Sequence, residues 1–406
     1  MTAFEWTISI TLASLAAATG VYWTVLITQV LATVRSVPNA DQGLRSPIPP
    51  RGPVCVVIPA HNEEEVIADL IRSLKAQTLD DFRVVLAFDR CTDQTEPIAL
   101  QEIDGDPRFR IVRVGPGPEG WAGKVNAVWQ GVLRATEAHR ASYLLFSDAD
   151  CVFHPRGIEA TVSLLERERL DMLSLVNRLT HDTWFERLVQ PGAGFELLTQ
   201  YPLRRANRER NRRGFANGQF MLFRASAYRR LGGHTAVTGE LLEDLAFARV
   251  MAEREMRQWA VMSGAMVTCR MYRSWDAFCK GWKRIFIEGA RRKPARLMKN
   301  AWQLRCTSTL LPTASIGAGL LSVGYAIAGS LPAAGWLLPI CAAWGVGAWA
   351  GGVSLIYGLG GYPLWMAFGH PIGAWMVADL LRESGRDRLD GRPVRWAGHS
   401  YARAVR

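Results

Sequence analysis

Hydrophobic residues are concentrated at the two ends of the chain, whereas its middle alternates short apolar runs with amphipathic stretches. Residues 6–34 carry no charged side chain, and a helix of this length crosses the roughly 30 Å hydrocarbon core of a bilayer. A second uncharged block, residues 307–378, fits two spanning helices at residues 308–328 and 333–357. These lengths favour membrane helices over the buried helices of a soluble domain. The first run is also longer than a secretory signal and lacks its basic start, which indicates a retained anchor.

Charges beside these runs predict the orientation of the chain in the membrane. Glu5 precedes the first run, whereas Arg35 and Arg45 follow it, so the positive-inside rule places the N-terminus outside and the middle of the chain in the cytosol. Two C-terminal spans return the chain to the cytosol, where the arginine-rich tail at residues 382–406 belongs. A third crossing would put this tail outside. We therefore expect the further apolar segment at residues 364–381 to be re-entrant or interfacial.

The middle of the chain has the pattern of an α/β fold. Short runs rich in β-branched and apolar residues at 54–59, 83–88 and 143–146 predict buried strands. Residues 63–77 and 125–135 place apolar side chains at helical spacing. Strands that alternate with helices predict a mostly parallel, Rossmann-like sheet flanked by helices.

These patterns predict five parts along the chain. An N-terminal anchor at residues 6–34 precedes an α/β domain at 52–290 and a basic amphipathic juxtamembrane segment at 291–306. A membrane region at 307–381 and a basic cytosolic tail at 382–406 follow. We therefore expect an integral membrane protein in the inner membrane of a bacterial-type cell, with the α/β domain in the cytosol.

The formal net charge of +11 arises largely from local clusters of basic residues. One cluster contains Arg204, Arg205, Arg208, Arg210, Arg212 and Arg213. A second contains Lys280, Lys283, Arg284, Arg291, Arg292, Lys293, Arg296 and Lys299. Cations beside a membrane helix gain roughly 1 kcal/mol each from an anionic leaflet, so a membrane-docked face is the simpler interpretation. Trp275, Phe278, Trp282 and Phe286 would form its apolar face or pack on the domain. Nucleic acid is not expected as a partner, because no RNP, zinc-finger or helix-turn-helix pattern is present.

The seven cysteines are scattered and contain no Cys-x-x-Cys pair. This spacing predicts neither a disulfide framework nor a zinc site, and it is typical of a reducing compartment.

Polar residues follow three of the predicted strands. The first strand leads into Pro59-Ala60-His61-Asn62-Glu63-Glu64, the second into Asp89, and the third into Ser147-Asp148-Ala149-Asp150. Ligands of open parallel sheets gather beyond the carboxyl ends of the strands. Two carboxylates there, Asp148 and Asp150, are suited to holding a hard divalent cation against a diphosphate. Asp89 could accept a hydrogen bond from a base or ribose, whereas Asn62 and Glu63 are equally suited to capping a helix.

Three further segments carry candidate chemistry. Lys124 follows a Gly/Pro-rich loop and opens a helix, where it could neutralise phosphate or be an ordinary surface lysine. Glu243 and Asp244 lie where a helix begins, so a carboxylate there is either a partner of the helix dipole or a general base. Gly218 and Gln219 belong to the segment Asn217-Gly218-Gln219-Phe220 between these two.

Together these motifs resemble the family 2 glycosyltransferases with a GT-A fold, over about residues 52–290. Pro59-Ala60-His61-Asn62-Glu63-Glu64 is similar to the family's opening motif, Asp148-Ala149-Asp150 to its Asp-x-Asp motif and Glu243-Asp244 to its acidic base motif. Asn217-Gly218-Gln219-Phe220, Gly232-Gly233-His234, Arg270-Met271-Tyr272-Arg273 and Trp396-Ala397-Gly398-His399-Ser400-Tyr401 resemble a membrane branch that includes hopanoid-associated and carotenoid or diaponeurosporenoate glycosyltransferases.

The resemblance implies an inverting transfer of a sugar from a nucleotide-diphosphate sugar, UDP- or GDP-linked, to a lipid acceptor. It assigns Asp244, with Glu243, to catalysis, Asp150, with Asp148, to Mg²⁺ or Mn²⁺, and Trp282 and Arg284 to the diphosphate or acceptor side. The nucleotide sugar would be bound by Pro59, His61, Glu63, Asp89, Lys124, Asp148, Gly218 and Gln219. The Gln-x-x-Arg-Trp motif of polymer-forming members is replaced by Lys280-Gly281-Trp282-Lys283-Arg284, which argues against processive synthesis. A sugar-phosphate or nucleotidyl transferase and a non-catalytic membrane scaffold remain as alternatives.

Overall fold

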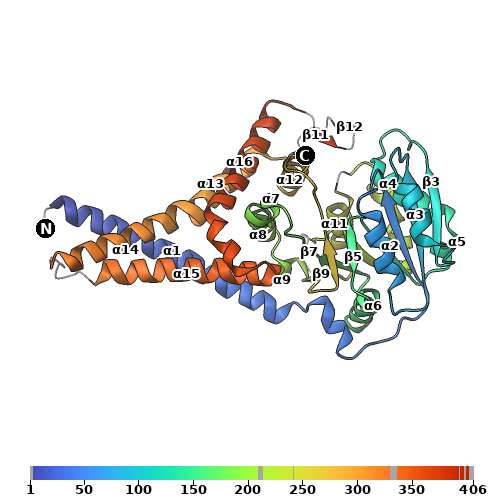
Figure 1. The fold of residues 1–406 in the computed structure, drawn as a ribbon, viewed down its shortest axis with the longest axis horizontal. Helices are drawn as coiled ribbons and strands as arrows, with labels where there is room; N and C mark the ends of the chain where they lie inside the picture. The colour runs from blue at the N-terminus through green and yellow to red at the C-terminus, as the bar shows by residue number, and fades with distance from the viewer. Residues whose placement is uncertain are drawn as a thin grey trace. The chain divides into compact units, whose positions relative to one another are not determined.

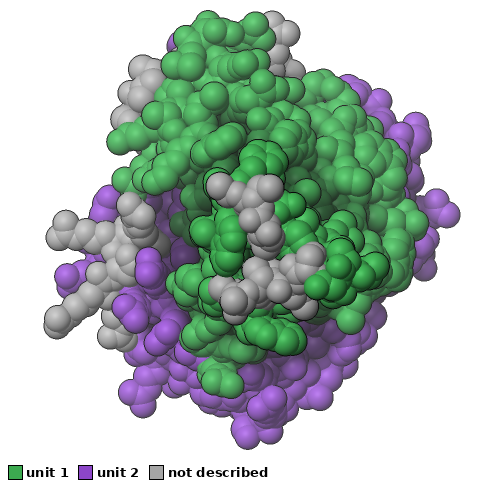
Figure 2. Space-filling model, turned by 90° about the vertical axis from the view of Figure 1, so that its left-hand side faces the viewer, with its two compact units in different colours: residues 1–35, 181–200, 272–406 green, residues 36–180, 201–271 purple. Residues whose placement is uncertain are grey.

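A computed structural model describes residues 3–208, 214–240, 242–329, 336–392, 394–396 and 399–401 (Figure 1). The chain forms two compact units, coloured separately in Figure 2. We call Ser36–Thr180 with Tyr201–Met271 the sheet unit, and Met1–Arg35 with His181–Gln200 and Tyr272–Arg406 the helical unit. The five predicted parts of the chain and their bounds remain predictions.

The sheet unit is built on a seven-stranded sheet in the order β3-β2-β1-β4-β8-β6-β9. Its strands are β1 (Val54–Ala60), β2 (Phe82–Asp89), β3 (Phe109–Val114), β4 (Tyr143–Ser147), β6 (Met172–Val176), β8 (Phe220–Arg224) and β9 (Gln258–Met262). Only β8 pairs antiparallel to its neighbours, so the expected mostly parallel α/β architecture is confirmed. The three strands predicted from the apolar runs are β1, β2 and β4. The central strand β1 is apolar without alternation because both of its faces are buried.

A second, three-stranded sheet follows directly after β4. It has the order β5-β10-β7, formed by β5 (Cys151–Phe153), β10 (Val267–Cys269) and β7 (Arg178–Leu179). Strands β5 and β10 are antiparallel, and Cys269 lies opposite Cys151. Residues far apart in the sequence are thereby joined next to the Asp148–Asp150 turn.

Helices of the sheet unit cover the sheet, and α4 begins close to the position expected for the helix at residues 125–135. They are α2 (Ile67–Lys75), α3 (Thr95–Ile103), α4 (Gly123–Arg134), α5 (Thr136–Arg140), α6 (Gly157–Arg167), α9 (Leu203–Ala206), α10 (Ala225–Leu231) and α11 (Glu243–Glu253), with 3₁₀ turns η1 (Ala40–Leu44) and η2 (Gly233–Val237). Apolar side chains of α4, α10 and α11 form one core with Val57, Val85, Phe146 and Phe223 of the sheet. Burial of this face fixes both helices and strands relative to one another.

The helix expected at residues 63–77 begins later than predicted. Residues 63–66 form a turn, and α2 starts at Ile67 with Val66 as its N-cap and no side-chain cap. Asn62 adopts a left-handed φ of 59° and binds the neighbouring loop, where its Oδ1 accepts from the backbone N–H of Thr92 at 2.8 Å. The predicted helix-capping role of Asn62 is therefore wrong, because its amide bridges two loops instead.

Among its described residues, the helical unit contains three helices that are long and apolar enough to cross a membrane: Phe4–Ser36, Pro294–Ile327 and Leu337–Gly360. Its elements are α1 (Ala3–Ser36), α7 (Trp184–Leu188), α8 (Gln190–Gln200), α12 (Trp275–Gly289), α13 (Pro294–Arg305), the π-helical turn η3 (Cys306–Leu310), α14 (Leu311–Ile327), α15 (Leu337–Gly360), η4 (Leu364–Gly369), α16 (His370–Leu389), β11 (Val394–Trp396) and β12 (His399–Tyr401). Each of the three predicted spans corresponds to one of the three long apolar helices.

Polar contacts connect the three candidate spans. Trp23 Nε1 donates to the backbone oxygen of Thr307 at 2.9 Å, and Ser315 Oγ donates to Thr19 Oγ1 at 3.0 Å. Trp344 Nε1 donates to Thr24 Oγ1 at 3.2 Å. Side-chain hydrogen bonds of this kind hold helices together where the surrounding lipid provides no hydrophobic driving force.

Three of the four aromatic residues of α12 are buried, whereas Trp275 is half-buried. Phe278, Trp282 and Phe286 are at most 2 % exposed, and their rings pack in sequence along the helix. Of the two roles left open for this apolar face, packing on protein is the one the structure shows. The segment at residues 364–381 forms η4 and the first part of α16. Arg210, Arg212, Arg213, Arg403 and Arg406 lie outside the described residues.

Candidate functional site

The topology of the sheet brings most of the predicted site residues to one edge. Strands β1, β2 and β4 are parallel, so Pro59, Asp89 and Asp148 all lie at or just beyond their carboxyl ends. Strand β8 runs in the opposite direction, and its first residue, Phe220, pairs with Ser147. This reversal places the Gly218–Gln219 turn beside the Asp148–Asp150 turn.

Lys124 joins two carboxylates that come from different elements. It is the second residue of α4, and its Nζ lies 2.6 Å from Asp148 Oδ1 and 2.7 Å from Glu243 Oε1. Burial works against the charge of the ammonium, but the two carboxylates outweigh it and raise the pKa of Lys124. The surface-lysine alternative is therefore wrong: the side chain belongs to a charged cluster at the sheet edge.

Asp244 is held in place by backbone N–H groups. Its Oδ2 accepts from the Gly218 N–H and its Oδ1 from the Leu245 N–H, each at 2.7 Å. Burial, and next the negative charge of Glu243, raise the pKa of Asp244 to about 6. A carboxylate with a pKa close to neutrality can take up a proton during a reaction, which suits a general base.

Gly218 approaches this cluster so closely that a side chain at this position would crowd it. A Cβ at this position would lie 3.1 Å from Glu243 Oε1, 3.2 Å from Lys124 Nζ and 3.3 Å from Asp244 Oδ2. Glycine is therefore the residue that lets the turn before β8 contact both acids of α11. Gln219 also holds this turn in place, because its backbone oxygen accepts a hydrogen bond from Ser147 Oγ at 2.8 Å.

Asp150 is a carboxylate whose contacts are thiols. Cys269 Sγ lies 3.1 Å and Cys151 Sγ 3.7 Å from its Oδ1, and among the described residues it forms no ion pair. Burial, and then the charge of Asp148, raise the pKa of Asp150 to about 7. A half-buried carboxylate without an ion-pair partner among the described residues matches a ligand for a hard cation such as Mg²⁺ or Mn²⁺, and Asp148 offers further oxygens nearby. The donor set thus fits the predicted metal.

The loops after β1 and β2 fasten one another. His61 Nδ1 lies 2.5 Å from the backbone oxygen of Asp89, and Glu63 donates its backbone N–H to Thr95 Oγ1 at 2.7 Å. The Asp89 carboxylate accepts two hydrogen bonds from the neighbouring Arg90, at 2.7 and 2.9 Å. Asp89 is thus bound to a cation from its own chain, a partner that the sequence pattern did not indicate.

Two cysteines and a histidine at this site were not predicted as functional residues. Cys151 and Cys269 contact Asp150, although their distance in the sequence gave no signal of a pair. His234 is fully buried and its Nδ1 lies 2.6 Å from the Tyr228 hydroxyl, while burial lowers the pKa of His234 to about 3. A neutral histidine therefore lies in the core close to Glu243.

Trp282 and Arg284 lie on α12 in the helical unit, so the structure does not place them at this cluster. Trp282 is 2 % exposed. Their role on the diphosphate or acceptor side remains a prediction.

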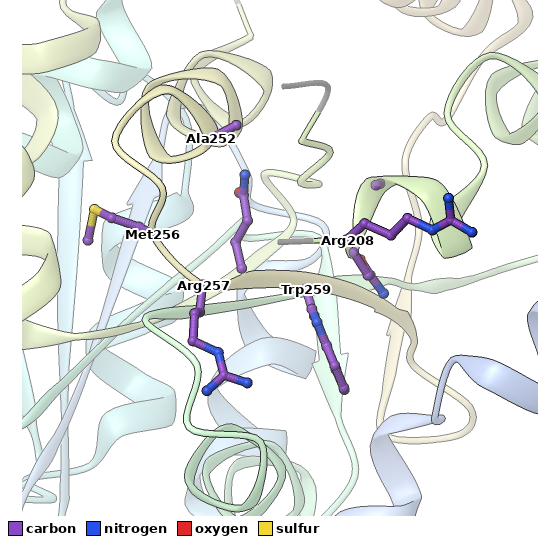
Figure 3. Close-up of a pocket in the computed structure, with 8 residues that line it drawn as sticks. Arg208, Ala252, Met256, Arg257 and Trp259 are labelled. Carbon is purple, nitrogen blue, oxygen red and sulfur yellow. The ribbon is translucent and has the colours of Figure 1, made fainter. Parts of the chain in front are cut away.

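A hollow in the sheet unit lies at a different place. Figure 3 shows its lining by Arg208, Met256, Arg257 and Trp259, around the end of α11 and the start of β9. Because β9 runs parallel to β6 and β4, the start of β9 is at the amino edge of the sheet. This hollow is therefore remote from the charged cluster, which lies at the carboxyl edge.

An acidic cluster with one lysine lies at the carboxyl edge of this mostly parallel sheet, which is the edge where α/β domains generally bind their ligands. Residues 55–232 match the family described as Glycosyl transferase family 2. This part of the chain is therefore similar to family 2 glycosyltransferases, as the sequence motifs indicated.

Individual relatives are more distant. The uncharacterized glycosyltransferase EpsJ of Bacillus subtilis (strain 168) is 28% identical over 120 residues, which cover 30% of this chain and 32% of that protein. The chain thus matches about a third of the length of this curated relative. The solved mannosyltransferase PcManGT from Pyrobaculum calidifontis, in complex with GDP-Man and Mn²⁺, is 16% identical with a TM-score of 0.45, over 83% of this chain and 97% of that one. S. aureus TarS 1-349 with UDP-GlcNAc is 12% identical with a TM-score of 0.40, over 86% and 96%.

Proposed function

We propose that this protein is a membrane-bound, inverting glycosyltransferase that moves a sugar from a nucleotide-diphosphate sugar to a hydroxyl group of a lipid or lipid-linked acceptor. The observation that carries the proposal is Asp244 in a family 2 glycosyltransferase domain. Its carboxylate is fixed by two backbone N–H groups, and burial and Glu243 raise its pKa to about 6. This is the state that a base needs to accept a proton from an acceptor hydroxyl near neutral pH.

The proposed reaction is a single displacement at the anomeric carbon. Asp244 removes the proton of the acceptor hydroxyl while this oxygen forms a bond to the anomeric carbon. The bond from that carbon to the diphosphate breaks on the opposite face, and the nucleoside diphosphate leaves with both electrons. Configuration at the anomeric carbon is inverted because attack and departure occur on opposite sides.

The charged cluster supports this displacement by positioning the diphosphate and the base. Asp150, with Asp148, would hold Mg²⁺ or Mn²⁺, which neutralises negative charge on the diphosphate when bound. Lys124 fixes Asp148 and Glu243 relative to each other, and its ammonium adds a positive charge at the edge where the diphosphate would lie. Glu243 keeps Lys124 charged and raises the proton affinity of Asp244.

A lipid acceptor is supported by the helical unit. Three helices of the described chain are long and apolar enough to cross a membrane, and the basic cluster that begins at Lys280 lies on α12, on α13 and between them. Such cations are attracted to an anionic leaflet. We propose that the glycosyltransferase domain lies on the cytosolic side of a bacterial-type inner membrane, where nucleotide sugars are available, and that the segment at residues 364–381 does not span it.

The test is release of nucleoside diphosphate by the full-length protein purified in detergent. Sugar nucleotides with different bases and sugars would be offered with Mn²⁺ or Mg²⁺ and a total bacterial lipid extract. Asp150→Ala and Asp244→Asn should both abolish lipid-stimulated release, whereas Glu253→Gln, an exposed acid at the far end of α11, should not. Release of inorganic diphosphate would instead indicate a nucleotidyl transferase. A folded protein that binds no nucleotide with metal would indicate a scaffold.

A further inference from the structure

Beside the cluster just described, a second group of ligand atoms surrounds Asp150. The ligand atoms of Asp150, Cys151 and Cys269 lie within 4.8 Å of one another. Both thiols are fully buried, and neither is part of a disulfide. Two sulfurs and one carboxylate oxygen are a donor set for a thiophilic cation, because soft thiolates select Zn²⁺ over Mg²⁺ and Mn²⁺.

Backbone pairing holds the two thiols on the same side of the small sheet. The Arg270 N–H donates to the Asp150 oxygen at 3.0 Å, and the His154 N–H donates to the Met266 oxygen at 2.9 Å. Hydrogen-bonded and non-hydrogen-bonded pairs alternate along an antiparallel ladder, so Cys151 and Cys269 form a non-hydrogen-bonded pair. Side chains approach most closely at such pairs. The proximity of the two sulfurs is therefore imposed by the fold rather than by a flexible side-chain rotamer.

A fourth polar group, the carboxamide of Asn177, lies beside the thiols. Asn177 is 6 % exposed, and its Nδ2 lies 3.8 Å from Cys151 Sγ. Within the described part of the chain, Asn177 Oδ1 is buried and has no hydrogen-bond partner. The two ends of a carboxamide exchange places by a half-turn. The same side chain can thus present its oxygen to an ion held by the thiols, which would satisfy the unpartnered atom.

We propose that Asp150, Cys151 and Cys269, completed by Asn177, form a binding site for a thiophilic divalent cation such as Zn²⁺, and that this ion inhibits the enzyme by withdrawing Asp150 from the diphosphate site. The inhibitory part rests on the proposed function, because it requires Asp150 to hold the Mg²⁺ or Mn²⁺ of the transfer reaction.

The observed distances are close to those of a tetrahedral zinc site. Zn–S bonds of about 2.3 Å and Zn–O bonds of about 2.0 Å place a sulfur and an oxygen ligand about 3.5 Å apart. The Cys269 and Cys151 sulfurs lie 3.1 and 3.7 Å from Asp150 Oδ1. These two oxygen–sulfur distances therefore need to change by only a few tenths of an ångström on binding. Each thiol would lose its proton to solvent as the metal–sulfur bond forms.

The first experiment measures binding by Cd²⁺, a thiophilic probe whose thiolate bonds absorb in the ultraviolet. The full-length protein in detergent, reduced and freed of metal with a chelator, should show thiolate–Cd²⁺ absorbance that saturates with one equivalent per chain. Cys151→Ser and Cys269→Ser should each lose most of this absorbance, whereas Cys91→Ser, which removes a half-buried thiol elsewhere in the sheet unit, should retain it. Equal absorbance in all four proteins would overturn the site.

A second readout needs no substitution. Zn²⁺ should protect Cys151 and Cys269 of the unmodified protein from alkylation under mild denaturation, as read by mass spectrometry of the peptides, and should leave Cys91 reactive. Equal alkylation with and without Zn²⁺, or a disulfide between the two cysteines in the reduced preparation, would refute the proposal.

Competition tests the link to the transfer reaction separately. Mn²⁺ bound in the presence of UDP or GDP is followed by electron paramagnetic resonance, and one equivalent of Zn²⁺ should release it. If Cd²⁺ binds as expected but Mn²⁺ stays bound, the thiol site exists and its inhibitory role is refuted. If no Mn²⁺ binds with either nucleotide while Cd²⁺ does, the proposed function fails instead.

Discussion

Lys124 Nζ lies 2.7 Å from Glu243 Oε1, and this pair connects the start of α4 to the start of α11. Glu243 is 5 % exposed, so its charge depends on this lysine. The contact explains why a lysine at the start of one helix and an acid at the start of another belong to one site. The contact also means that each residue stabilises the charge of the other.

Removing the lysine should destabilise the fold through the buried acid it leaves behind. Lys124→Met is expected to cost about 1–3 kcal/mol of unfolding free energy, because an unpaired buried acid retains its desolvation penalty. Combining it with Glu243→Gln should recover part of this loss. Chemical unfolding of the four proteins of this double-mutant cycle measures the coupling. Additive losses would show that the two side chains do not interact.

Asp244→Asn should lower the turnover number by on the order of 10² to 10⁴ while the affinity for donor and metal stays nearly unchanged. The substitution keeps the size of the side chain and removes the ability to take up a proton. Steady-state kinetics and nucleotide titration would separate the two effects, with Glu253→Gln as the matched acid-to-amide control. A comparable loss in the control, or an unaffected Asp244→Asn enzyme, would exclude Asp244 as the base.

The rate of transfer should rise with pH through about 6. A base must be deprotonated to act, and the pKa of Asp244 is raised to about 6 by burial and by the charge of Glu243. Glu243→Gln removes that negative charge and should move the rising limb to lower pH. A pH profile of kcat/KM for both proteins checks the direction. A shift to higher pH would contradict this origin of the raised pKa.

Gly218→Ala should impair transfer without unfolding the protein. The added methyl group would lie 3.1 to 3.3 Å from Glu243, Lys124 and Asp244, so these side chains would have to move by a few tenths of an ångström. Misplacement of reacting groups on this scale costs roughly tenfold to hundredfold in rate. Gly115→Ala is the matched control, because nothing lies within 4 Å of its added carbon. Equal activity of the two variants would show that the approach of Gly218 is not required.

Sidedness can be tested with a membrane-impermeant thiol reagent on single-cysteine variants. A cysteine in place of Phe4, at the start of α1, should be labelled in intact cells, whereas Cys91 of the sheet unit should be labelled only after the cells are opened. The expectation follows from Arg35 and Arg45 after the first span. Labelling of Cys91 in intact cells would reverse the proposed orientation.

Sequence patterns alone determined the class of fold and a part of its elements. The β-branched runs became β1, β2 and β4, and the uncharged runs became α1, α14 and α15, because burial and lipid both select for apolar side chains over a fixed length. Asp148, Asp150 and Asp244 were found from their positions after strands and at a helix start. The start of α2 was predicted too early. The Asn62 amide binds the neighbouring loop and does not cap the helix, which periodicity cannot show.

Only the tertiary structure decided which of these groups meet. The reversed strand β8 brings Gly218 to Asp244, and the pairing of β5 with β10 sets Cys151 opposite Cys269 beside Asp150. Neither contact has a signal in local sequence, because both arise from strand order and register between distant segments. The cysteines were interpreted as scattered for the same reason. A sequence specifies what each residue can do, whereas the pairing of its strands decides with which partner it does so.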